Sequence, residues 1–281
     1  MPAEGFPRAG RARGGPRVHG PGTGGSRRPR WDTDTGITER DVAALHWLGE
    51  QYGARSDVLR VLLGRLSPGT PQIQGVIGEE TLRQVLDRWA DRKLILRDRL
   101  LGFLWVAPTE RALRLVGLDV RPWVFVIPQL AHVHAVGIVR LALEPQLAEG
   151  GRWVSERELR RDSSKRRVPD GAIQLPEDPD RPVGRGLVGE AVDPLPRRVA
   201  VEVELARKSS GRLRERWTHP GRWLRTVYYA PPQIGGYLRG QLERIDPKHP
   251  VDIHPLPQVA GTAYMQVRRS GLRGTGRGGG S

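Results

Sequence analysis

Residues that could form a hydrophobic core are almost absent from both ends of this 281-residue chain. Residues 1–34 and 266–281 consist mainly of Gly, Arg and other residues with little apolar surface. Such segments bury too little apolar area to offset the entropy of ordering, so we predict that both are disordered. The fold must therefore be built by residues 35–265, which suffice for one or two ordinary domains.

The positive charge of the chain is concentrated in these same ends. The net charge is +15, from 46 Lys and Arg against 31 Asp and Glu. Residues 1–30 have a net charge of +6, and residues 266–281 have a net charge of +4. A polyanion is the expected partner, and nucleic acid is the default. Only four of the basic residues are Lys, which is typical of a GC-rich genome, so abundant Arg does not by itself indicate phosphate recognition.

The composition excludes several classes of protein. The chain has no cysteine, which excludes disulfide bonds, thiolate zinc sites, iron–sulfur clusters and thiol nucleophiles. The longest mostly apolar stretch, 123–143, is interrupted by polar side chains and falls short of the roughly 20 apolar residues of a membrane span. The first 30 residues lack the apolar core of a secretory signal. We expect a cytoplasmic protein with no membrane partner.

The periodicity of apolar residues in 35–118 predicts three short helices, then a two-stranded hairpin and a fourth helix. These elements begin, in chain order, at a Thr38–Asp41 capping box, Ser56, Glu79, Leu94 and Thr109. This order is typical of a winged helix-turn-helix domain, whose third helix enters the major groove of DNA.

The third predicted helix, 79–91, and the predicted hairpin turn, 97–99, carry polar side chains suited to DNA. Arg and Gln can bind base edges, and Arg also neutralises phosphate. The predicted DNA-contacting residues are Arg83, Gln84, Arg88, Arg92, Arg97 and Arg99. The alternative is a solvated helix face whose intrahelical ion pairs contribute about 0.2–0.5 kcal/mol each.

Residues 119–150 form a mostly apolar segment with a predicted helix over 128–147. This helix would link the two halves of the chain or pair two copies into a homodimer. His132 and His134 form a His-x-His pattern without a Cys or carboxylate partner at ligand spacing. We therefore interpret both histidines as packed or interfacial residues rather than zinc ligands.

The second half of the chain has the pattern of an α/β unit. Its predicted elements are a strand ending at Val154, a helix with a Ser155–Glu158 capping box, strands near 171–175, 199–205 and 226–229, and helices beginning near Lys208 and over 236–245. Together with the first half, this pattern predicts the α+β class.

Acidic residues in this half are placed where a hard cation could bind. Asp170 stands at a Pro-Asp-Gly turn that enters a strand, and Glu202 and Glu204 share one face of the alternating run 199–205. Mg²⁺ prefers such carboxylate oxygens, and Lys208 could orient a water or offset developing charge. The alternative is an ordinary turn and a strand side that faces solvent.

Taken together, these segments resemble the replication-relaxation proteins of plasmids and integrative elements in actinobacteria and other Gram-positive bacteria. The resemblance covers about residues 35–245. It rests on the winged-helix order, on the segments 130–134 and 139–143, and on the motifs at 168–171 and 201–208. It implies a role in plasmid replication and DNA relaxation, with double-stranded plasmid DNA as the partner.

The second half also resembles the PD-(D/E)xK nuclease fold, a four-stranded sheet flanked by helices. This resemblance implies that Asp170 is the first metal ligand and Glu202 the second, with Mg²⁺ as the cofactor. Glu204 stands where the usual Lys stands, and Lys208 would be a displaced lysine. Glu156 would match the acid of the first helix of that fold.

The sequence thus predicts an α+β protein with five parts. These are a disordered tail (1–34), a winged-helix domain (35–118), a linking helix (119–150), a restriction-endonuclease-like α/β domain (151–265) and a second disordered tail (266–281). Three functions fit this organisation. The first is a DNA-binding protein of plasmid replication or transfer, the second is a Mg²⁺-dependent nuclease or nickase, and the third is a scaffold that binds replication or conjugation proteins through 119–150. The sequence favours the first, with the nuclease or nickase as the alternative.

Overall fold

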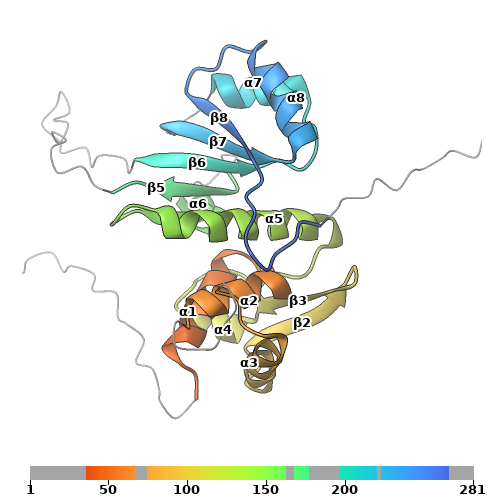
Figure 1. Ribbon diagram of the computed structural model, residues 1–281. Coiled ribbons are helices and arrows are strands. Elements are labelled where there is room, and N and C mark those ends of the chain that lie inside the picture. The colour runs from red at the N-terminus through yellow and green to blue at the C-terminus, as the bar shows by residue number, and fades with distance from the viewer. Residues whose placement is uncertain (1–35, 68–74, 163–167, 177–196, 220–222, 266–281) are drawn as a thin grey trace, which may run out of the picture. The chain divides into compact units, whose positions relative to one another are not determined.

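The computed structural model describes residues 36–67, 75–162, 168–176, 197–219 and 223–265, all within one compact unit, Thr33–Ser281 (Figure 1). The fold is mixed, with helices and two separate sheets, which confirms the predicted α+β class. The predictions of disorder for 1–34 and 266–281 lie outside the described residues. Among the helices of the described ranges, none is both long and apolar enough to cross a bilayer.

The first part of the fold combines short helices with a three-stranded antiparallel sheet of order β1-β3-β2. Its elements are α1 (Glu39–Glu50), β1 (Ala54–Arg55), α2 (Ser56–Arg65), α3 (Glu79–Asp91), β2 (Ile95–Leu100), β3 (Phe103–Pro108) and α4 (Glu110–Leu115). The predicted capping box is confirmed. The Asp41 amide donates to the Thr38 hydroxyl at 3.2 Å, and the Thr38 amide donates to the Asp41 carboxylate at 3.0 Å.

The hairpin turn lies further along the chain than predicted. Residues 97–99 belong to β2, and the tip of the hairpin is Leu101-Gly102, with φ angles of 54° and 82°. Two-residue hairpin turns need such positive φ angles, which Gly adopts freely. The prediction of a turn at 97–99 is therefore wrong: polar residues are typical of turns, but here Arg-Asp-Arg lies within β2 and Leu101 takes the left-handed position.

Helix α5 (Ile127–Leu143) connects the two sheets, because it contacts α2 and β1 on one side and β6 on the other (Figure 1). It ends before the predicted 147, and a 3-10 helix (Glu144–Gln146) follows, in which Pro145 has no N–H to continue the α-helix. Residues 133–141 are buried within the chain's own fold. Homodimer formation through this segment would therefore use the exposed residues before them, such as Val124 and Ile127.

The second sheet has the order β4-β5-β6-β7-β8. Its strands are β4 (Arg152–Ser155), β5 (Gly171–Gln174), β6 (Arg198–Val203), β7 (Arg225–Ala230) and β8 (Val251–Pro255), and its helices are α6 (Glu156–Asp162), α7 (Ser210–Thr218) and α8 (Pro232–Leu242). Strands β4, β5 and β6 pair antiparallel, whereas β6, β7 and β8 run parallel through the crossover helices α7 and α8. Strand β8 was not predicted, since its Asp, His and Pro obscure an apolar pattern.

One of the two hydrogen bonds of the predicted Ser155–Glu158 capping box is confirmed. The Glu158 amide donates to the Ser155 hydroxyl at 3.2 Å. The Glu158 carboxylate instead pairs with Arg152 on β4, at 2.6 Å. Helix α6 is thus fixed to the strand before it, with Glu156 as its first residue.

Gly171, the first residue of β5, leaves no room for a side chain. A Cβ there would lie 2.1 Å from Cζ2 of Trp153, a buried residue of β4. We expect Gly171→Ala to lower the free energy of unfolding by about 1–3 kcal/mol, since Trp153 would have to move. Urea denaturation measures this loss. Gly211→Ala, where nothing lies within 4 Å, is the control and should not destabilise the protein. Equal urea midpoints for wild type and Gly171→Ala would contradict the close packing of Trp153 against position 171.

Candidate functional site

The carboxylates of Asp170 and Glu202 are neighbours across β5 and β6. These strands pair antiparallel with Gly171 opposite Val201, which places Asp170 opposite Glu202 at the next position. The backbone N–H of Val203 donates to Asp170 Oδ2 at 2.7 Å. Glu202 is buried, with 4% of its surface exposed. Strand pairing therefore brings together the two residues that the sequence predicts as metal ligands.

The two carboxyl groups differ in their pKa values. Burial, followed by the negative charge of Asp170, raises the pKa of Glu202 to about 7, although Arg216 and Lys208 oppose this rise. Burial also acts to raise the pKa of Asp170. The hydrogen bond and charge of His132, with a backbone amide and Lys208, outweigh burial and hold that pKa below its usual value. Neighbouring acids with pKa values driven apart are typical of functional sites, and a cation relieves their repulsion.

Each predicted acid of the sheet has a basic partner. Arg216 of α7 pairs with Glu202, Lys208 pairs with Glu204, and His132 Nε2 lies 3.0 Å from Asp170 Oδ1. Glu202 and Glu204 are both buried. The alternative of a strand side that faces solvent is therefore wrong.

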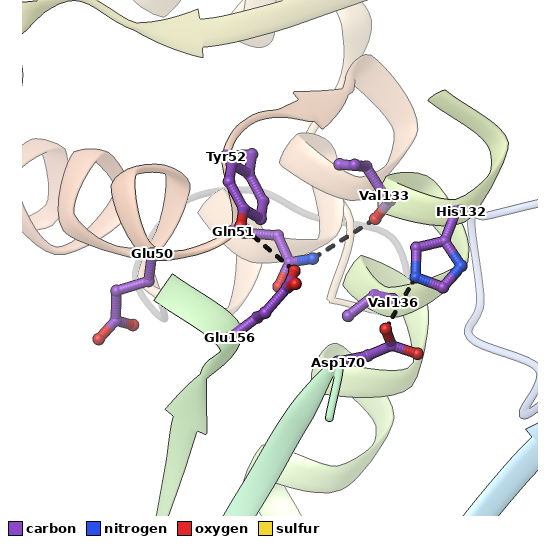
Figure 2. Close-up of a pocket in the computed structure, with 8 residues that line it drawn as sticks. All are labelled: Glu50, Gln51, Tyr52, His132, Val133, Val136, Glu156 and Asp170. Carbon is purple, nitrogen blue, oxygen red and sulfur yellow. Dashed lines mark hydrogen bonds and ion pairs between the residues drawn. The ribbon is translucent and has the colours of Figure 1, made fainter. Parts of the chain in front are cut away.

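Glu156 lies close to Asp170, in a pocket at the junction of α1, α5 and α6 (Figure 2). The Tyr52 hydroxyl donates to Glu156 Oε2 at 3.2 Å, and Arg160 pairs with Glu156 Oε1. Figure 2 shows His132 extending from α5 to Asp170 at the other side of this pocket. The pocket is lined by Glu50, Gln51, Tyr52, His132, Val133, Val136, Glu156 and Asp170.

Sequence reasoning missed two members of this site. His132 was interpreted as packed or interfacial, and its contact with Asp170 joins residues 38 positions apart, which no local pattern could indicate. Arg216 was not considered. Its signal is its position three residues after buried Leu213, which places it near the buried face of α7.

Asp170 and Glu202 are suited to a Mg²⁺ ion, because this ion usually binds one or two carboxylates and keeps several waters. Burial is the main cause of the raised pKa of Glu202, and the negative charge of Asp170 adds to it; a cation between the two groups would offset that charge. Within the described ranges, no group of three or more His, Asp or Glu side chains is placed to hold a metal. Glu204 pairs with Lys208 and Glu202 pairs with Arg216, so a cation at Asp170 and Glu202 would take the place that the Arg216 guanidinium occupies beside Glu202.

The predicted DNA-contacting face of α3 is largely engaged within the protein. Arg88 Nη2 lies 2.8 Å from both carboxylate oxygens of Asp41, a fully buried residue of α1. Arg88 is therefore half-buried and paired with α1, and its role in DNA binding stays a prediction. Arg83 is exposed, but it pairs with Glu80 at 2.6 Å and with Asp87 at 3.4 Å.

The other predicted contacts lie on α3, at its C-cap and on β2. Three of them are bonded to groups of α3: Gln84 to Glu80, Arg92 to the Arg88 carbonyl, and Arg97 to Asp87. Arg99 is exposed on β2. The surface of α3 therefore presents basic groups that already have partners within the protein.

Comparison with known proteins assigns this chain to no family. No protein-family model, curated protein or solved structure matches the chain. The resemblance to the replication-relaxation proteins stays a prediction, and function is inferred from the geometry of the site.

The contribution of Glu202 to the stability of the metal-free protein is expected to fall between pH 5 and pH 8. The folded protein holds the Glu202 proton up to a pKa of about 7, against 4.5 for an ordinary Glu, so this contribution is complete below pH 4.5 and is lost as the pH rises through 7. The contribution of His132 to stability is also lost as the pH rises, because its pKa is raised in the folded protein. Burial lowers its pKa, but the hydrogen bond and charge of Asp170 outweigh burial and raise it.

Urea unfolding in chelator at several pH values measures this loss, which amounts to about 1.4 kcal/mol for each unit of pKa shift. Glu202→Gln cannot titrate and should show a shallower decline, whereas exposed Glu215→Gln should keep the wild-type decline. If the Glu202→Gln and wild-type proteins declined equally, the raised pKa would be contradicted.

Proposed function

We propose that this chain is a DNA-processing protein that binds Mg²⁺ at Asp170 and Glu202 and cleaves one strand of duplex DNA. The observation that carries the proposal is the pair of carboxylates, Glu202 buried and Asp170 half-buried, placed opposite each other across β5 and β6. Two adjacent carboxylates favour a hard cation, and the +15 net charge of the chain favours a polyanionic substrate.

The residues of the site have distinct roles in this proposal. Asp170 and Glu202 hold the cation, which when bound lowers the pKa of water and offsets charge on a phosphate. His132 orients Asp170 through their hydrogen bond. The charge of Lys208 acts on both carboxylates, so its ammonium is close enough to offset charge that develops on a phosphate. Arg216 balances Glu202 in the absence of a cation.

We also propose the finer fold assignments. The order α1-β1-α2-α3-β2-β3, with the sheet order β1-β3-β2, supports a winged helix in 35–118. Strands β4 to β7 with helices α6 and α7, and acids at β5 and β6, support a PD-(D/E)xK-like domain in 151–265. Under the resemblance to replication-relaxation proteins, the substrate is supercoiled plasmid DNA, which a nick relaxes.

A supercoiled-plasmid assay with the full-length protein tests this proposal. We expect conversion to the nicked circle in Mg²⁺ and none in excess chelator. Failure to nick in Mg²⁺, or equal nicking in chelator, would refute the proposed activity.

A second candidate is DNA binding through the winged helix without cleavage. The element order of 35–118 and the exposed side chains of Arg83 and Arg99 favour it. This candidate predicts tight binding to the origin of the parent plasmid, weaker binding to random duplex, and no nicking in Mg²⁺. It also predicts that binding falls steeply with salt, because phosphate contacts release counterions.

A further inference from the structure

Three basic residues, Lys208, Arg212 and Arg216, stand four positions apart in the chain segment that follows β6. Lys208, five residues after the end of β6, pairs with Glu204, and Arg216 of α7 pairs with Glu202. Arg212 stands between them, one helical turn before Arg216. Residues four apart lie on the same face of a helix, so Arg212 shares the face of α7 that meets Glu202.

Arg212 differs from its two neighbours because its side chain is exposed. Within the described part of the chain, no acidic side chain pairs with it. Arg83 of α3, by contrast, is bound to Glu80 and Asp87. Among the described residues, a polyanion at Arg212 would displace no acid, whereas at Arg83 it must compete with two.

The local charge also favours α7 over α3 as a surface for DNA. Residues 205–219 contain five basic residues and one acid, a net charge of +4. Residues 79–91 contain two basic residues and four acids, a net charge of −2. Phosphates are attracted to the first segment and repelled by the second.

We propose that Arg212 binds a phosphate of the DNA strand that lies at Asp170 and Glu202. This inference rests on the function proposed above and assigns the DNA contact nearest the carboxylates to α7. The planar guanidinium of Arg presents several N–H groups that match a phosphate, and its charge is retained at every working pH.

The matched control for Arg212 is Arg214. It lies on the same helix, is also exposed, and has no acidic partner among the described residues. Because each helical residue turns the chain by about 100°, Arg214 lies about 200° around α7 from Arg212. Arg212→Gln and Arg214→Gln thus remove the same charge from two different faces.

Binding of a fluorescent DNA duplex, titrated in chelator at several salt concentrations, tests the inference. We expect Arg212→Gln to weaken binding about five- to tenfold near 0.1 M salt and to lower the salt slope by about 0.9, the loss of one phosphate contact. Arg214→Gln should bind within about twofold of wild type. Equal melting temperatures of the two variants would confirm that both remain folded.

Equal binding by the two variants, whether both match wild type or both are weakened alike, would overturn the assignment. The same conclusion follows if Arg212→Gln weakens binding of a single-stranded RNA but not of the DNA duplex. If wild type nicks plasmid in Mg²⁺ while Arg212→Gln binds like wild type, only this inference fails. If wild type neither binds nor nicks DNA, the proposed function fails with it.

Discussion

Replacement of Asp170 by asparagine is expected to lower Mg²⁺-dependent nicking of supercoiled DNA by at least about a hundredfold. Asparagine has the size of aspartate and can still accept from the Val203 amide and bond to His132. It lacks the negative charge that would hold a cation next to Glu202. The fold should therefore persist while the activity is lost, and the initial rate of nicked-circle formation measures the loss.

Asp252→Asn is the control for this prediction. It makes the same chemical change in the same sheet, on β8, where Asp252 pairs with exposed Arg225 at 3.2 Å. We expect it to nick at nearly the wild-type rate, and we expect Glu202→Gln to lose activity as Asp170→Asn does. If Asp170→Asn nicked within about threefold of the Asp252→Asn rate, the carboxylate pair would not be the catalytic centre.

Replacement of Arg88 by methionine is expected to lower the free energy of unfolding by about 3 kcal/mol, because it leaves a buried carboxylate without its main partner. Burial raises the pKa of Asp41, but the Thr38 amide and the charge of Arg88 outweigh burial and keep this carboxyl ionised. Arg40, at 3.4 Å from Asp41, retains part of the pairing. Urea denaturation of the two proteins measures the difference.

Arg83→Met is the control on the same helix. Its ion pairs with Glu80 and Asp87 are exposed, so its loss should leave the urea midpoint nearly unchanged. Similar stability of the two variants would show that Arg88 does not hold α3 to α1. An effect of Arg88→Met on DNA binding must for this reason be corrected for the unfolded fraction.

Much of the fold could be predicted, because local patterns determine it. The Thr38–Asp41 capping box and the period of α3 predict where helices begin, and both are confirmed. Strict alternation places Glu202 and Glu204 together on one face of a strand, and the Pro-Asp-Gly turn places Asp170 at the start of another. These features depend on residues within a few positions of each other.

The remaining features depend on contacts between distant segments. The register of β5 against β6 brings Asp170 opposite Glu202, and no local pattern specifies that register. The helical period of 79–91 predicts that Arg88 lies on the outward face of α3. Its ion pair with Asp41, 47 residues earlier, instead holds the side chain against α1. His132 meets Asp170 only because α5 lies against the second sheet.

In the proposed function, Asp170 and Glu202 hold one divalent cation. Isothermal titration calorimetry of Mg²⁺ into the full-length, chelator-treated protein measures this binding. We expect one ion per chain for wild type and Asp252→Asn, and no binding for Asp170→Asn. Absence of binding in wild type, or binding of equal strength in Asp170→Asn, would contradict the claim.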